Sequence, residues 1–359
     1  MELQTKPDAA KCVQRAQAWW DRGIIDRTPV TVFVRPERPP RPVPGHHRSL
    51  RDRWVDVEYA VDCVEAAVEA GTYLAECFPL CCPNVGPEVC AAAYGAELEF
   101  SENTSWSVPC VEDIRDVPSL EPDLDSPYWS VIRHMTDLSI ARGAGRWLTA
   151  LIDLHTNGDL LAALRDPQAL ALDYAMDFDG VSAACRHITP HAMVFYDDLY
   201  RRIAAAGLPC KTWGHAFSLG RMYYVSCDFI CMISPAMLAE TILPSLIWEI
   251  DHLDHSIFHL DGPDALRHLD TLLDIEKLDA VQWTFGAGNG PASNWIDVYR
   301  RILRAGKGIE VLAESFEDAR AVMDQLPPEG VWLHVAGRYG RGETQAFIDD
   351  VCRWSERKR

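Results

Sequence analysis

Two ionisable residues separated by one position, His259 and Asp261, are the sharpest local signal for chemistry in the sequence. They end a predicted strand at residues 256–261, where side chains two positions apart point to the same side. An imidazole nitrogen and a carboxylate oxygen are both ligands that zinc accepts. His334, near the end of a later predicted strand, is expected to supply a third ligand. The alternatives are a hydrogen-bonded histidine–aspartate pair and a histidine that binds substrate directly.

A second group of polar residues follows the predicted strand at residues 147–153, in the segment IDLHTNGD at 152–159. Asp153 is expected to act as an acid or base, or to anchor a substrate amine. Asn157 is expected to orient the substrate. Asp159 has a simpler expected role, which is to cap the helix that begins at the next residue.

Polar residues at the ends of other predicted strands extend this set. Glu76 ends the second predicted strand and Asp228 ends the fourth, and both are expected to be catalytic together with Asp153. The residues expected to bind substrate are Asn157, Trp213, Gln282, Trp283 and Arg35. For any one of these residues, the simpler alternative is that it caps a helix or binds a loop amide.

These side chains converge only if the strands that carry them are parallel neighbours. Short β-rich runs alternate with longer segments of helical period, the pattern of a parallel sheet wrapped by helices. Most of the runs are continuously apolar, as in strands buried on both faces. The eight predicted strands span residues 29–34, 72–76, 147–153, 223–228, 256–261, 280–284, 309–313 and 331–335. They predict an α/β fold, a (β/α)8 TIM barrel forming a single domain over residues 1–359, with its site at the carboxyl ends of the strands.

The segments between the strands complete this architecture. Amphipathic stretches at residues 57–70, 235–253, 264–273 and 295–305 are expected to form the outer helices. A helix at residues 8–21 is expected to cover or flank the bottom of the barrel. Residues 35–53 are rich in Pro, Arg and His, which favours an extended loop, and residues 82–128 form a second insertion. Both are expected to lie over the carboxyl-terminal face.

Composition limits the classes of function. The formal net charge of the 359 residues is -19, and Lys and Arg are not clustered before the last three residues, which argues against nucleic-acid binding. The amino terminus lacks the apolar region of a signal peptide, and no apolar run approaches the roughly 20 residues that span a bilayer. We therefore expect a soluble, cytoplasmic protein. Its 12 cysteines are expected to be reduced thiols.

The order of these motifs resembles that of the uroporphyrinogen decarboxylase superfamily, from Arg27 to Trp354. The resemblance implies a TIM barrel with its substrate pocket at the carboxyl ends of the strands. The segments that carry it are DRTPV at 26–30, GRW at 145–147 through Asp153, Leu161 with RDP at 165–167, Cys227-Asp228 with ISP at 233–235, Leu243-Pro244, and HLDG at 259–262.

Two branches of that superfamily have different signatures. True uroporphyrinogen decarboxylases carry Arg-Gln-Ala-Gly-Arg after the first strand, whereas this chain has VRPER at 34–38. Corrinoid-dependent methyltransferases use His-x-Cys on the fifth strand, and a Cys near the eighth, to hold a zinc ion. In this chain His259 matches directly, while Asp261 and His334 stand as substitutes for the two cysteines.

The resemblance therefore implies methyl transfer between a small methylated compound and a cobalamin cofactor, carried by a separate corrinoid protein. Zinc would be held by His259, Asp261 and His334. The alternative is a metal-free decarboxylase of a porphyrinogen or another carboxylic acid, with arginines such as Arg35 binding the substrate carboxylates. A monomer and a homodimer are both compatible with the sequence.

Overall fold

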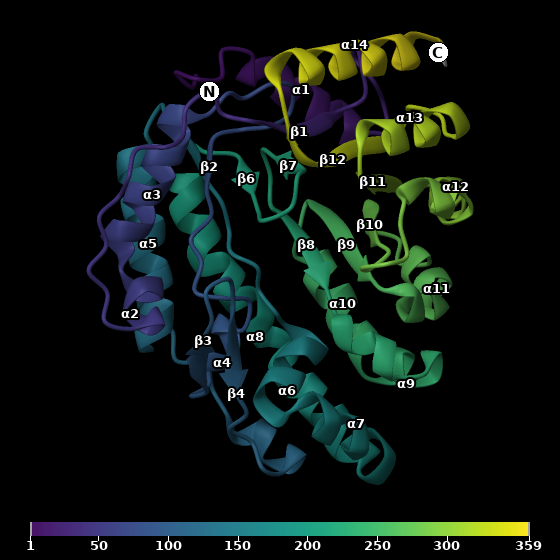
Figure 1. The fold of residues 1–359 in the computed structure, drawn as a ribbon. Helices are drawn as coiled ribbons and strands as arrows, with labels where there is room; N and C mark the ends of the chain where they lie inside the picture. Colours follow the sequence, from purple (N-terminus) through teal and green to yellow (C-terminus); the bar gives the residue numbers. More distant parts are fainter. Residues whose placement is uncertain (1, 358–359) are drawn as a thin grey trace.

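One six-stranded parallel sheet organises the computed structural model, which describes residues 2–357 (Figure 1). The sheet curls, and its strands follow the order β1-β12-β11-β10-β9-β8. The strand bounds are β1 Val30–Val34, β8 Met222–Ser226, β9 His255–Asp261, β10 Ala280–Thr284, β11 Gly308–Ala313 and β12 Val331–Tyr339. All six overlap predicted strands, and these six predictions are confirmed.

The outer face of the sheet is buried under helices, which explains why the strands are apolar on both sides. Phe258, Leu260, Val281 and Val311 are all fully buried. Figure 1 shows the later helices along the outside of the sheet. Their bounds are α9 Pro235–Glu240, α10 Ile242–Asp251, α11 Leu269–Leu273, α12 Ile296–Arg304, α13 Phe316–Gln325 and α14 Arg341–Arg357.

The middle of the chain contributes the remaining helices and four short strands. The helices are α2 Leu50–Val55, α3 Val57–Ala70, α4 Val89–Ala93, α5 Pro127–Gly143, α6 Asn157–Arg165, α7 Pro167–Met176 and α8 Phe178–Ala205. The predicted helix at 57–70 is confirmed. The predicted helix at 235–253 is instead two helices, α9 and α10, which meet at Thr241. The predicted helix at 264–273 begins as a 3-10 helix and becomes α11.

Short strands lie between β1 and β8 in place of long ones. Strand β2, Leu80–Cys81, pairs in parallel with β5, Leu148–Thr149. Strand β6, Cys210–Lys211, pairs antiparallel with β7, Phe217–Ser218. Single backbone hydrogen bonds connect the chain segments next to these short strands: Glu76 N donates to Val30 O at 3.0 Å, and Leu151 N donates to Lys211 O at 2.8 Å. Among the described residues the main sheet therefore has six strands, and not the eight that the sequence predicts.

The predicted strand at residues 72–76 is wrong. The chain turns there, with Ala75 at a φ of 48°, a left-handed conformation that does not extend a strand. The strand in this part of the chain, β2, begins four residues later. The prediction at 147–153 is confirmed only for Leu148–Thr149.

Helix α1, Ala9–Trp20, lies at the amino end of the sheet, as expected for the segment 8–21. Trp20 stacks on His255, the first residue of β9, and its Nε1 donates to the carbonyl of Phe217 at 3.0 Å. Trp19 packs edge-on against Trp332 of β12. Two buried indole rings thus hold this helix against the sheet.

The two predicted insertions differ in form. Residues 35–49 form the predicted loop, but residues 50–53 of the predicted loop belong to helix α2. Arg41 binds Glu65 and Glu69, so the loop runs beside α3. Residues 82–128 contain α4, a 3-10 helix at Ile114–Ser119, and a hairpin of β3 Glu97–Phe100 and β4 Ser105–Val108.

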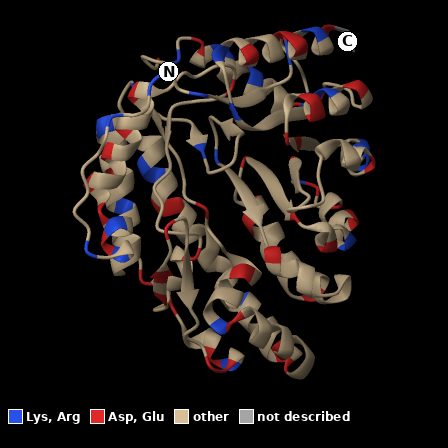
Figure 2. Ribbon diagram, viewed as in Figure 1, with Lys and Arg blue, Asp and Glu red and all other residues tan. Residues whose placement is uncertain are grey.

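Charge is spread over the outside of the molecule. Figure 2 shows Lys and Arg positions interspersed with Asp and Glu along the outer helices. The last two residues, Lys358 and Arg359 of the basic tail, lie outside the described part of the chain. Within residues 2–357, every helix is too short or too polar to cross a bilayer.

Candidate active site

Three side chains converge at the carboxyl ends of two neighbouring strands. Asp228 follows β8, and His259 and Asp261 end β9. Ser226 of β8 is paired with His259, so Asp228, two residues beyond Ser226, comes level with Asp261. One ligand atom from each of the three side chains lies within 4.8 Å of the other two. The pairing of β8 with β9 thus builds a site with one imidazole and two carboxylates.

The neighbouring strand fixes the orientation of the imidazole. Gln282 of β10 is paired with His259, and its Oε1 lies 2.5 Å from His259 Nδ1. Because the amide oxygen only accepts, Nδ1 must donate this hydrogen bond, which leaves Nε2 as the nitrogen that can bind a ligand. Metal-binding histidines usually have such a partner for their second nitrogen. The Trp213 ring packs edge-on against His259, with 5.2 Å between ring centroids.

The segment between β5 and α6 brings further ionisable groups to the same place. His155 Nε2 lies 3.7 Å from Asp153 Oδ2. Asp159 does not cap the helix of which it is part. Its two carboxylate oxygens instead accept the backbone N–H groups of Asp228 and Phe229, both at 2.9 Å. Asp159 therefore holds the backbone that presents Asp228.

Crowding of these groups changes their proton affinities. Burial raises the pKa of Asp153, and burial together with the Asp159 carboxylate raises the pKa of Asp228 to about 6. Burial disfavours a charged His155, but the carboxylates of Asp159 and its neighbours outweigh it and raise the pKa of His155 above its usual value. Shifts of this kind, produced by burial and specific charged neighbours, are typical of functional sites.

A cavity of about 250 Å³ opens beside these groups. Its polar wall includes Glu88, His155, Asp159 and Asp228, and no lysine or arginine lines it. Its remaining lining residues are Ala162, Pro167, Phe229, Cys231 and Met232. The cavity is acidic on one side and mainly apolar on the other.

His334 is not part of this group, so the prediction that it supplies the third ligand is wrong. In the sheet, β10 and β11 separate β9 from β12, a distance of about 14 Å at the usual strand spacing. His334 instead stacks on His215, with ring centroids 3.6 Å apart. Burial and the His215 and Lys211 charges lower its pKa to about 2, so it is neutral at physiological pH. Asp228 takes its place because β8 is adjacent to β9.

A buried polar network surrounds His334. Glu310 of β11 binds both His215 Nδ1 and the Tyr224 hydroxyl. Lys211 donates to the carbonyls of Gly214 and Ala216, and burial lowers its pKa to about 8. The sequence analysis did not single out Glu310 or Lys211. A charged residue inside an apolar run such as GIEVLA, at 308–313, is the signal that could have found Glu310.

Glu76, expected to be catalytic, lies at the opposite end of the sheet. Its side chain is fully buried, and its two oxygens bind Arg27 at 2.6 and 3.0 Å. It also binds Arg15 at 3.2 Å and accepts the N–H of Val30, the first residue of β1, at 2.8 Å. Because the chain turns at residue 76 instead of ending a strand there, this carboxylate stays at the amino end of the sheet.

Two expected substrate contacts also lie elsewhere. Trp283 points to the outer face of β10, where it is fully buried and packs edge-on against Trp295. The period of two explains this, because Gln282 next to it faces the inside. Arg35 is exposed, and its guanidinium donates to the carbonyl of Arg338 at 3.1 Å.

The other expected contacts divide into two kinds. Gln282 and Trp213 both touch His259. Asn157 is buried, and its amide nitrogen donates to the Ser226 carbonyl at 3.0 Å and to Glu249 at 3.3 Å. Asn157 therefore holds α6 against β8 instead of facing the cavity.

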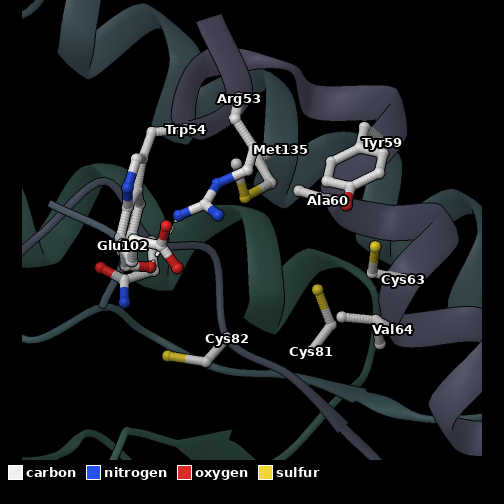
Figure 3. Close-up of a pocket in the computed structure, with 11 residues that line it drawn as sticks. Arg53, Trp54, Tyr59, Ala60, Cys63, Val64, Cys81, Cys82, Glu102 and Met135 are labelled. Atoms are coloured by element: carbon white, nitrogen blue, oxygen red, sulfur yellow. Dashed lines mark hydrogen bonds between the residues drawn. The ribbon is translucent and has the colours of Figure 1, made fainter. Parts of the chain in front are cut away.

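A second cavity, of about 330 Å³, lies between α2, α3 and α5 (Figure 3). Cys63, Cys81 and Cys82 border it. Burial raises the pKa of Cys81 and raises that of Cys82 to about 12, so both are neutral thiols. Across residues 2–357, the one cluster of histidine, cysteine and carboxylate groups close enough to hold a metal ion is that of Asp228, His259 and Asp261.

Comparison with known proteins shows the fold. No protein-family model matches the chain, and no curated protein matches it in sequence. Among solved structures, a methyltransferase from Methanosarcina mazei is similar, with a TM-score of 0.61 and 10% sequence identity. The likeness covers 96% of this chain and 98% of that one. The chain therefore shares the fold of that structure over nearly its whole length.

Proposed function

We propose that this protein is a methyltransferase that moves a methyl group between a small methylated compound and the cobalt of a cobalamin, carried by a separate corrinoid protein. The observation that carries the proposal is the cluster of Asp228, His259 and Asp261 at the carboxyl end of a sheet in a methyltransferase-like fold. On this view the short strands close the six-stranded sheet into a single-domain barrel, with the site at its mouth.

The donor atoms of this cluster fit a divalent metal ion such as zinc. Two carboxylates and an imidazole with a free Nε2 form an oxygen-rich donor set. Such a set favours harder cations than a thiolate site does. A metal ion held there would act as a Lewis acid on the heteroatom that bears the methyl group.

The other residues of the site have roles in binding and proton transfer. A bound cob(I)alamin would supply the electron pair for the new bond to the methyl group, and the heteroatom of the substrate would keep the pair of the broken bond. The heteroatom then needs a proton. His155, next to Asp153 and in the cavity wall, is placed to supply it. The Trp213 ring limits the space next to His259.

Decarboxylation has less support. Binding of a substrate polycarboxylate requires cationic side chains in the pocket, yet no lysine or arginine lines the acidic cavity and Arg35 is bonded to a backbone carbonyl. The negative charge of this cavity would repel an anionic substrate.

The test is transfer of methyl groups to cob(I)alamin from a panel of methylated amines, ethers and thiols, followed by the visible spectrum of methylcobalamin. Wild type should be active on at least one donor, and His259→Ala should be at least 100-fold slower. His134→Gln, at an exposed position on α5, is the matched control and should equal wild type. Failure of the wild-type protein with every donor would overturn the proposal.

A further inference from the structure

The inner face of the sheet carries a fully buried carboxylate, Glu310 of β11. Glu310 is paired with Gln282 of β10, which is paired in turn with His259, so these three side chains face the same side. In the described part of the chain, the one ion pair of Glu310 is with His215, in the loop between β6 and β7. The partner of this buried carboxylate is thus an imidazole, whose charge can change, and not a lysine or arginine.

Hydrogen bonds fix the His215 imidazole relative to Glu310. One Glu310 oxygen accepts from His215 Nδ1, and the other accepts from the Tyr224 hydroxyl. That hydroxyl also accepts the backbone N–H groups of His215 and Ala216, at 3.0 and 2.9 Å. Because a carboxylate only accepts, Nδ1 must donate the hydrogen bond, which leaves Nε2 as the nitrogen that can exchange a proton with a ligand. Enzymes use an imidazole held in this way by a carboxylate for proton transfer.

The titratable groups around the His215 ring are Glu310, Tyr224, His334 and Lys211. Burial alone would raise the pKa of Glu310, but the charge and hydrogen bond of His215, together with Tyr224 and Lys211, lower it below its usual value, so Glu310 is a carboxylate. Burial raises the pKa of Tyr224, which stays a hydroxyl. His334 is neutral, as its pKa of about 2 requires. Of the two stacked imidazoles, His215 is therefore the one that can take up a proton.

An apolar surface lies next to this ring. Phe33 of β1 is 38% exposed, and its ring centroid lies 6.5 Å from that of His215 and 5.8 Å from that of His334. Leu312 of β11, paired with His334, is half-buried. The His215 side chain is itself 19% exposed. A partly exposed imidazole beside exposed apolar side chains has the character of a small-molecule site, in which a few polar groups orient a mainly apolar ligand.

We infer that His215 binds and deprotonates a small ligand on the inner face of the sheet, and that Glu310 positions His215 for this step. The ligand carries an O–H or S–H group for Nε2 and an apolar group for Phe33, as a small alcohol, phenol or thiol does. The proton leaves the oxygen or sulfur atom, which keeps the electron pair of the broken bond, and joins the lone pair of neutral Nε2. Glu310 stays a carboxylate and stabilises the imidazolium. The step needs neither a metal ion nor cobalamin, so the inference goes beyond the proposed function.

The probe for the experiment is 4-nitrophenol, because its phenolate is yellow and its phenol is not. Full-length protein treated with chelator is titrated with the probe at a pH at which the free probe is mostly phenol. Wild type and the control His134→Gln should bind it as phenolate, and His215→Gln should lose the phenolate signal. Phe33→Ala should bind it about 10-fold more weakly, because apolar contact is lost. Circular dichroism and thermal melting confirm folding, and Phe33→Ala, at an exposed position, remains the test if His215→Gln does not fold.

Glu310→Gln separates positioning from a structural role. The ratio of phenolate to phenol in the bound probe should fall by about 10-fold or more, because the imidazolium loses a charged partner. A purely structural Glu310 would lower the melting temperature of the variant and leave that ratio unchanged. Equal phenolate signals in wild type and folded His215→Gln, or no binding of the probe to wild type, would overturn the inference. Methyl transfer is measured separately, so its failure does not bear on this result.

Discussion

Carboxylate side chains lie at both ends of the sheet, and their partners differ: Glu76 at the amino end is fully buried, whereas Asp153 at the carboxyl end is half-buried and Asp228 is exposed. At the amino end, Glu76 is bound by Arg27, Arg15 and the N–H of Val30. At the carboxyl end, Asp153 and Asp228 form no ion pair with any described lysine or arginine.

The difference separates structural from functional charge. A buried carboxylate with two arginine partners is already neutralised and has no capacity left for a ligand. Carboxylates that lack such partners are held at a cost to the fold, which is expected where they bind a cation or move a proton. Carboxylates at the two ends of the sheet thus differ in role according to the residues that surround them.

The largest expected effect comes from the amino end. Glu76→Ala should lower the free energy of unfolding by about 3–5 kcal/mol, because it leaves Arg27 buried without its partner. Urea denaturation measures this loss. Methyl transfer per folded molecule should not change, and a selective loss of activity without a loss of stability would contradict the structural role of Glu76.

Glu249 differs from the carboxylates at both ends of the sheet, because its buried carboxyl group is protonated and therefore neutral below a pH of about 8. Thr156 and Asn157 donate to it, and burial raises its pKa to about 8. Between the ordinary value near 4.5 and about 8, the folded state binds a proton that the unfolded state has lost, so stability falls as pH rises through this window.

Glu249→Gln should remove that dependence. The variant should gain stability relative to wild type as pH rises from about 5 to about 8, by roughly 1.4 kcal/mol per pH unit at most. Thermal melting across this range, with Glu240→Gln on the neighbouring helix α9 as control, measures the difference. Parallel curves for wild type and Glu249→Gln would show that Glu249 ionises normally.

At the carboxyl end, Asp228→Asn should have the opposite signature to Glu76→Ala. We expect at least a 100-fold loss of Zn²⁺ affinity, equivalent to about 2.7 kcal/mol, because one of the three ligands of the cluster loses its charge. Stability without metal should be unchanged or higher, because a crowded negative charge is removed. Calorimetric titration measures the Zn²⁺ affinity, and urea denaturation measures the stability without metal. A large loss of stability in Asp228→Asn would show that Asp228, like Glu76, has a structural role.

The smallest expected effect is at Gln282. Gln282→Leu removes the acceptor for His259 Nδ1 and should weaken Zn²⁺ binding by about 10–100-fold with the ligands themselves intact. Gln282→Glu keeps an acceptor and should retain most of the affinity. Equal affinities for all three proteins would show that His259 does not depend on this hydrogen bond.

The alternation of apolar runs and helical segments in the sequence determined the six strands of the main sheet, because buried parallel strands and amphipathic helices have distinct periods. It also determined that His259 and Asp261 share a face, since side chains two apart on a strand always do. Only the tertiary structure decided that Asp228 completes their cluster, that His334 does not, and that Trp283 faces outward. Spacing along one strand is a local property of the chain, whereas strand order, and the side of each strand that faces inward, are set by packing across the whole sheet.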